Sequence, residues 1–186
     1  MKLSLLTTTL LLTGTLYASQ HTVSPVQEGK QAIKLLGKTL KSQLKEKLQL
    51  DPTGATAIAF CTAEAQSLTQ AVNEKLPSHI KVRRTSLHLR NASNAADQTD
   101  VKVMYAFKEA IKNKSETALV MKKVKVGDTI RLYKPLVAGK ACLKCHGENI
   151  APEIATAIKA AYPNDNATGL KLGDFRGVIV AEVKEK

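Results

Sequence analysis

Residues 118–137 read ALVMKKVKVGDTIRLYKPLV, and this stretch decides the fold. On both sides of Gly127-Asp128, apolar and often β-branched residues alternate with polar ones, which is typical of strands with one buried face. A Gly-Asp pair between two such runs favours a tight hairpin turn. We therefore expect antiparallel strands over Ala118 to Val126 and Thr129 to Val137, with further strands over His79 to Leu89 and Phe175 to Val183.

Helical periodicity surrounds these strands. Apolar residues recur at steps of three and four over 23–50 and again over 51–76, where Asp51-Pro52 has the form of a helix start. Shorter helices are expected over 97–113 and 151–161. Helices followed by antiparallel strands with a helix inserted indicate an α+β fold. The length of 186 residues suits one domain over 19–186, with N-terminal helices over 23–50 and 51–76 and a sheet-forming part over 79–186.

The first eighteen residues have the layout of a secretory signal peptide. Lys2 precedes an apolar run that is diluted by threonine and ends at Leu16-Tyr17-Ala18. The alternative is an uncleaved membrane anchor, although the run is short for a transmembrane helix. Cleavage would begin the mature chain at Ser19 and deliver it to the periplasm.

The chain is strongly basic. Its 28 Lys and Arg against 16 Asp and Glu give +12, or 27 − 16 = +11 once Lys2 leaves with the signal peptide. Such a charge favours an anionic partner. Export argues against nucleic acid, which leaves an acidic redox protein or peripheral contact with an anionic membrane. One lysine run falls on the first predicted helix, where the sequence favours a solvated face over a docking patch: Lys30, Lys34, Lys38, Lys41, Lys45 and Lys47.

The stretch Cys142-Leu143-Lys144-Cys145-His146 is a C-x-x-C-H pattern, the attachment motif of c-type haem. The two thiols add to the haem vinyl groups, and the adjacent imidazole ligates the iron. A redox dithiol would need a βαβ setting and a zinc site a second pair of ligands, and the sequence offers neither. We expect one covalent haem c held by Cys142 and Cys145, with His146 as metal ligand. Aromatic residues are only 4% of the chain and Trp is absent, which suits a core built around a large flat cofactor.

The second axial ligand is less closely defined by the sequence. Cys61 lies on the apolar side of the helix predicted over 51–76, and it is the thiol that remains when haem attachment uses the other two. Its alternative role is that of a small buried apolar residue. Five other side chains have suitable chemistry: Met104, Met121, His21, His79 and His88.

Several motifs in this chain resemble those of one family, the Tll-type haem domains, which are exported single-haem proteins with a PAS-like fold. The motifs appear in family order: Arg84-Thr85-Ser86 with Arg90-Asn91, Tyr133-Lys134-Pro135-Leu136 before the C-x-x-C-H pattern, Tyr162-Pro163, and Gly173-Asp174-Phe175-Arg176-Gly177. The family is known from a cyanobacterial cytochrome and from sensor domains of bacterial signalling proteins. The resemblance implies a PAS-like antiparallel sheet and His/Cys axial ligation, with Cys61 at the position of the family's cysteine ligand.

Arginine is rare, and its positions are informative. The chain holds five Arg among 28 basic residues, and we expect Arg84, Arg90 and Arg176 to bind the haem propionates, because the guanidinium fork suits carboxylates. The alternative is that these arginines form structural ion pairs with Asp165, Asp174 or the backbone. Turn chemistry accounts for Asp165 and Asp174 better than a paired carboxylate site does.

Two functions follow from these expectations. The first is electron transfer in the periplasm, favoured because no output domain is attached. The second is a haem-based sensor of redox state or of small ligands that acts through a separate partner. An enzyme is not expected, since a strong second ligand would close the iron site.

Overall fold

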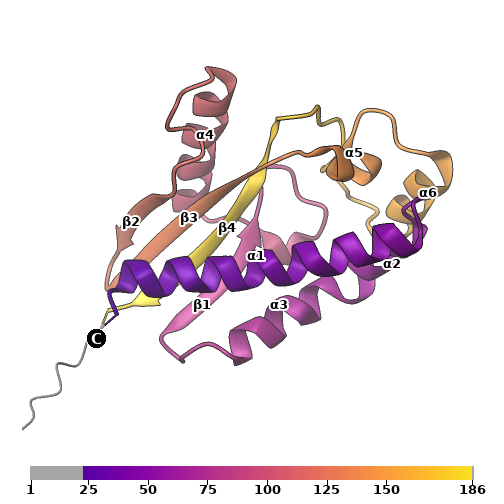
Figure 1. Ribbon diagram of the computed structural model, residues 1–186. Helices are drawn as coiled ribbons and strands as arrows, with labels where there is room; N and C mark the ends of the chain where they lie inside the picture. Colours follow the sequence, from indigo (N-terminus) through magenta and orange to yellow (C-terminus); the bar gives the residue numbers. More distant parts are fainter. Residues whose placement is uncertain (1–22, 186) are drawn as a thin grey trace, which may run out of the picture.

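The computed structural model describes residues 23–185, so the predicted signal peptide lies outside the described part of the chain. At its centre is a four-stranded sheet in the order β1-β4-β3-β2 (Figure 1). The strands are β1 (Ile80–Thr85), β2 (Lys122–Val126), β3 (Thr129–Val137) and β4 (Phe175–Lys184), and all neighbours are antiparallel. The α+β class is therefore confirmed, whereas the PAS-like identity stays a prediction.

The hairpin expected from residues 118–137 is present. Val126 pairs with Thr129, and Gly127 takes a φ of 58°, a value that suits glycine at a two-residue turn. The first strand is shorter than expected, because residues 118–120 form turns in which the Ala118 and Val120 amides bond to the Ser115 and Thr117 carbonyls.

One face of the sheet is covered by α1 (Pro25–Leu50), as expected for the first amphipathic helix (Figure 1). Its first half buries Ala32, Ile33 and Leu36 against side chains of β1, β3 and β4. A Cβ on Gly29 would lie 2.6 Å from Cδ1 of Leu132, so glycine permits the close contact of helix and sheet.

The helix predicted over 51–76 is divided into α2 (Ala55–Ala63) and α3 (Ala65–Glu74). The division falls at Glu64, and the two parts pack against different neighbours: α2 against α6 (Pro152–Ala161), and α3 against β1. One continuous apolar stripe could not face both. The side-chain amide of Asn73 holds α3 to β1, donating to the Val82 carbonyl at 2.8 Å and accepting from its amide at 2.7 Å.

The predicted helix start at Asp51-Pro52 is also wrong by one turn. Asp51 ends α1, and its carboxylate accepts from the amides of Thr53 and Thr56, both at 2.9 Å. The capping chemistry is therefore present, but it acts across the turn that precedes α2: the helix begins at Ala55, and Asp51 reaches the amide of its second residue, Thr56.

The opposite face of the sheet is covered by α4 (Gln98–Lys112). Asp97 and Asp100 form a capping box at its start. Met104 and Phe107 pack against Tyr133, Val178 and Val180 of the sheet.

Two short helices follow β3 at one end of the sheet: α5 (Lys140–His146) and α6 (Figure 1). At the same end β1 stops at Thr85, four residues before its predicted end at Leu89. A Cβ at Gly177, whose φ is 147°, would lie 2.6 Å from the Thr85 carbonyl oxygen, so the two backbones meet closely there. Within residues 23–185, no helix is both long and apolar enough to span a membrane.

Candidate functional site

The C-x-x-C-H motif forms most of α5, which begins after Gly139 and ends before Gly147. A loop from the C-terminal third of the chain lies against it: the Leu170 amide donates to the His146 carbonyl at 2.9 Å, and the Gly169 amide to the Gly147 carbonyl at 3.0 Å. Residues 162–174 thus hold the motif in a fixed backbone setting.

The imidazole of His146 is oriented by the same loop. Its Nδ1 lies 2.6 Å from the Ala167 carbonyl oxygen. Because a carbonyl only accepts, Nδ1 must carry the proton and Nε2 keeps its lone pair. This is the arrangement in which a backbone carbonyl fixes a histidine for metal ligation through Nε2. The sequence did not single out Ala167, since a backbone acceptor has no residue-type pattern.

Arg176 faces the free nitrogen of this imidazole. Its guanidinium donates to Nε2 of His146 at 3.0 Å. Burial, with Arg176 and Arg90 nearby, lowers the pKa of His146 to about 3, so the imidazole is neutral. Burial, together with Arg90, also lowers the pKa of Arg176 to about 10.

Arg84 and Arg90 lie in the same region, and the three arginines have unequal partners. Arg90 binds the Asp165 carboxylate at 3.0 Å and the Cys145 carbonyl at 2.6 Å, so the predicted ion-pair alternative is realised for this residue. Arg84 has only a long bond to the Ala65 carbonyl at 3.4 Å, and its buried Nε has no partner. Burial lowers the pKa of Arg84.

Charge in this arginine cluster, defined as Arg84, Arg90 and Arg176, is therefore not balanced by the described protein. Asp165 is the one carboxylate bound to it within residues 23–185. Asp174, the other predicted partner, accepts from the Lys171 amide at 2.7 Å, and Asp165 also accepts from the Ala167 amide at 3.0 Å, as the turn interpretation expects. Buried cations without partners are costly, so this chemistry fits an anionic group such as a haem propionate.

Cys61 lies close to the motif although it belongs to α2. Cys61 and Cys145 pack against the same apolar cluster of Ile58, Ile154 and Ile158. Burial raises the pKa of the Cys61 thiol, as does the Cys145 thiol, whereas Arg84, Arg90 and Arg176 act in the opposite direction. The Tyr162 hydroxyl donates to the Cys61 carbonyl at 3.1 Å, which connects the Tyr-Pro motif to this helix.

The other ligand candidates lie in different places. Met104 belongs to α4 and is fully buried between this helix and the sheet, and Met121 packs against the core cluster on the α1 side. His79 bonds to the Glu28 carboxylate at 3.2 Å, and His21 lies outside the described residues. Among the alternatives within residues 23–185, His88 alone shares a cavity with residues that contact His146.

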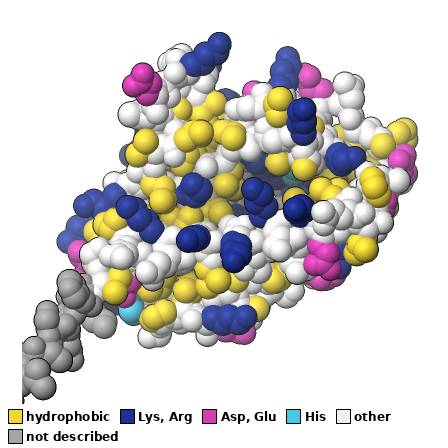
Figure 2. Space-filling view, in the orientation of Figure 1, with side chains coloured by type: hydrophobic (Ala, Val, Ile, Leu, Met, Phe, Trp, Pro, Cys, Tyr) yellow, Lys and Arg dark blue, Asp and Glu magenta, His cyan; other side chains and the backbone are white. Residues whose placement is uncertain are grey.

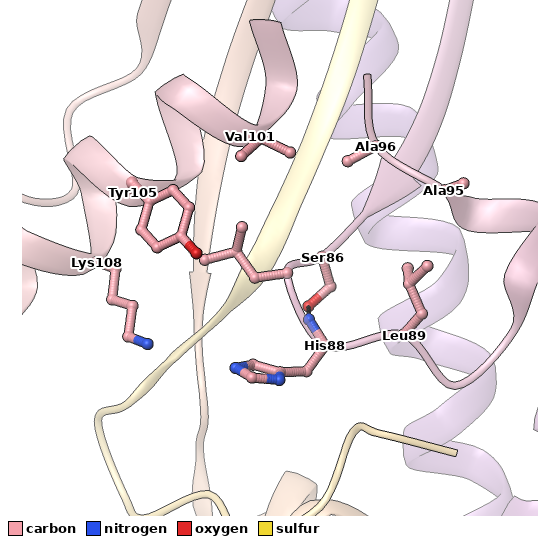
Figure 3. A pocket seen from close by; sticks show the side chains of 9 residues that line it. Ser86, His88, Leu89, Ala95, Ala96, Val101, Tyr105 and Lys108 are labelled. Carbon is pink, nitrogen blue, oxygen red and sulfur yellow. Dashed lines mark hydrogen bonds between the residues drawn. The ribbon is translucent and has the colours of Figure 1, made fainter. Parts of the chain in front are cut away.

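That cavity is one of two adjoining ones between α4 and the loop after β1. The first, of about 390 Å³, is shown in Figure 3, where His88 from the loop and Lys108 from α4 point toward one another. The second, of about 320 Å³, is also lined by His88 and Lys108, and it reaches Ala167 and Arg176. Space is therefore available beside the two groups that hold the His146 imidazole.

Among residues 23–185, no three His, Cys, Asp or Glu side chains converge as a metal site made of protein ligands alone. The three cysteines form no disulfide with one another. The groups near α5 are thus a neutral imidazole, three thiols and the three cations of the arginine cluster. This set fits a haem that is attached through two thiols, with an imidazole nitrogen and the third sulfur available as axial ligands and the arginines available for the propionates.

Comparison with known proteins gives a consistent result. No curated protein matches the chain. Among solved structures, the crystal structure of the cyanobacterial heme-protein Tll0287 matches with a TM-score of 0.60 and 20% identity, over 84% of this chain and 92% of that one. At this identity the match shows a shared fold. A model of the Tll0287-like family matches residues 12–183, nearly the whole sequence, and the chain therefore belongs to the Tll0287-like family.

Proposed function

We propose that this protein is an exported c-type haem protein of PAS-like fold that transfers electrons in the periplasm. Cys142 and Cys145 would hold one haem covalently, and His146 would ligate its iron through Nε2. The observation that carries the proposal is the fixed imidazole: Nδ1 is bound to the Ala167 carbonyl at 2.6 Å, at the end of a C-x-x-C-H helix. A family relative described as a heme-protein supports it.

Cys61 is the proposed second axial ligand. It shares an apolar cluster with Cys145, and the three nearby guanidiniums partly oppose the burial that raises the pKa of its thiol. A bound haem would supply one-electron chemistry at its iron, and a thiolate ligand adds negative charge there, which favours a low potential.

Of the three arginines expected to bind the haem propionates (Arg84, Arg90 and Arg176), Arg84 and Arg176 are the proposed partners. Arg84 and Arg176 bind no carboxylate within residues 23–185, and Arg84 Nε is buried without a partner. Two cations in need of acceptors match two propionates. Arg90, already bound to Asp165, would then serve mainly to position Cys145 through its carbonyl.

The second candidate function is a sensor of redox state or small ligands. It is favoured by the cavity of about 320 Å³ whose wall includes Ala167 and Arg176, since a molecule bound there would touch both groups that orient His146. In this function the Cys61 ligand would be released, and the response would pass to a separate partner protein.

Expression with a c-type haem maturation system tests the proposal. We expect the denatured protein to keep one haem by mass, the double variant Cys142→Ala, Cys145→Ala to lose it, and the secreted chain to begin at Ser19.

The second axial ligand is tested by spectroscopy. Cys61→Ala should change the oxidised low-spin spectrum, and an unchanged spectrum would remove Cys61 as ligand. Carbon monoxide and nitric oxide added to the reduced protein separate the functions. A closed six-coordinate haem supports transfer, and binding with Cys61 release supports sensing.

A further inference from the structure

The outer side of α1 carries a continuous row of lysines. Exposed lysines follow one another at steps of four, four, three and four, a spacing that places them on one side of the helix: Lys30, Lys34, Lys38, Lys41 and Lys45. The opposite side of α1 is buried against the sheet.

The sheet adds two more cations beside this row. Lys123 pairs with Leu132 across β2 and β3, so both side chains lie on the face that α1 covers. Lys134 follows two residues after Leu132 and shares that face. Both lysines are exposed. We call these seven residues the basic face, and Figure 2 shows dark-blue side chains along α1 and around the hollow beside it.

The charge of the basic face is not neutralised locally. Within residues 23–185, the lysines that form salt bridges are Lys125, Lys171 and Lys184, none of which belongs to the face. Of the two glutamates in α1, Glu28 bonds to His79, which leaves Glu46. The sequence alone favoured a solvated face, but the added sheet lysines and the lack of ion pairs were not visible there.

The basic face adjoins the helix of the C-x-x-C-H motif. The Lys144 ammonium of α5 donates to the Pro52 carbonyl at 2.7 Å, directly after the end of α1. In Figure 1, α5 lies toward the same end of the molecule as the C-terminal end of α1. A protein seated on the basic face would therefore lie next to α5.

We propose that the basic face is the docking surface for an acidic protein that exchanges electrons with this chain, an inference that rests on the proposed function. Charge complementarity of this kind mainly raises the rate of encounter. An anionic membrane fits less well, because a helix that lies in a bilayer interface inserts its apolar side, and the apolar side of α1 is buried in the core.

The test compares two triple charge reversals of equal size in the haem-loaded protein. Lys34→Glu, Lys38→Glu and Lys41→Glu alter the basic face. Lys102→Glu, Lys114→Glu and Lys159→Glu alter exposed lysines elsewhere and serve as the control. Two probes are used: a short polyglutamate peptide for equilibrium binding, and hexacyanoferrate(III) for oxidation of the reduced protein.

At low salt we expect the face variant to weaken polyglutamate binding and to slow oxidation by about tenfold, with a much smaller effect of the control. Equal effects of both variants would mean that only net charge matters and would overturn the proposal. So would a face variant that keeps polyglutamate binding but loses binding to vesicles of phosphatidylcholine and phosphatidylglycerol. Because polyglutamate binding does not need haem, a chain that binds the peptide but carries no haem would contradict the proposed function separately.

Discussion

Arg83 and Arg84 are neighbours on β1, yet their side chains lie on opposite faces of the sheet in opposite electrostatic settings. Arg83 binds the Asp100 carboxylate at 2.9 Å and Glu182 at 3.0 Å, and Arg131 and the Tyr133 hydroxyl join the same group. Arg84 reaches only a backbone carbonyl, in the arginine cluster beside α5. We call the first group the Asp100 network.

The two groups differ in how many carboxylates are available to their arginines. In the Asp100 network, cations and carboxylates are matched. The buried Asp100 ties the start of α4 to β1 and β3, and Glu182 of β4 joins through Arg83 and Arg131. In the arginine cluster, three cations share one carboxylate. Because unpaired buried cations are costly, the excess positive charge of the arginine cluster indicates a site for a bound anion.

The largest expected effect is that of Asp100→Asn. Asp100 is completely buried, and its loss leaves Arg83 without a major carboxylate partner. Breaking a buried pair in this way costs about 3–5 kcal/mol, so the free energy of unfolding in urea should fall by that amount. The control is Asp128→Asn, which removes an exposed pair with Lys184 and should change stability by less than about 1 kcal/mol. Similar losses of unfolding free energy in both variants would show that the Asp100 network does not stabilise the fold more than an exposed ion pair does.

The next largest expected effect is the difference in stability between variants of the two neighbouring arginines, Arg83 and Arg84. Arg83→Gln removes charge-assisted bonds to two carboxylates and should lower the free energy of unfolding by about 2–3 kcal/mol. Arg84→Gln, compared in the same haem-free chain, removes a buried cation without a carboxylate partner, and the free energy of unfolding should change by no more than about 0.5 kcal/mol. Urea unfolding of the two variants measures the difference. Equal losses would contradict the distinction between the two groups.

A third effect concerns the haem potential. Arg176 lies beside the His146 imidazole, and removing its charge favours the more positive, oxidised iron. A coupling of about 1–2 kcal/mol corresponds to a fall in midpoint potential of roughly 40–90 mV in Arg176→Gln. Redox titration of the haem-loaded protein measures it. Arg83→Gln is the comparison, and a shift of the same size there would remove Arg176 from the site.

The sequence predicted the strands, the hairpin, the outer face of α1 and the residues of the motif, because periodicity and turn residues are local. It proposed Arg84 and not Arg83 as a propionate partner, and the alternation of side chains along a strand places these two arginines on opposite faces. It missed the break at Glu64, since the need to face α6 and β1 in turn arises only from tertiary packing. It could not place Asp100 in this network, because the partners of Asp100 come from β1 and β3, far away in the chain.

The smallest expected effect is that of Tyr133→Phe, and it tests the Asp100 network through pH. The Tyr133 hydroxyl donates to Asp100 at 3.0 Å, and its loss should cost about 1 kcal/mol at neutral pH. Burial and the Asp100 carboxylate raise the pKa of Tyr133 to about 12, from an ordinary value of 10.0. Because the folded protein holds this proton more tightly than the unfolded chain, the stabilisation is complete below pH 10 and is lost as pH rises towards 12.

Tyrosinate absorbance, followed during a pH titration of the folded protein, measures this shift. Burial also raises the pKa of Tyr162, so the signal of Tyr133 is the late step that is present in wild type and missing in Tyr133→Phe. The variant should also lose less stability than wild type between pH 10 and 12. Tyr105→Phe is the control, since Tyr105 is exposed on α4. If the late step assigned to Tyr133 survives in Tyr133→Phe, Asp100 does not hold this hydroxyl. The Asp100 network then consists of its arginines and carboxylates alone.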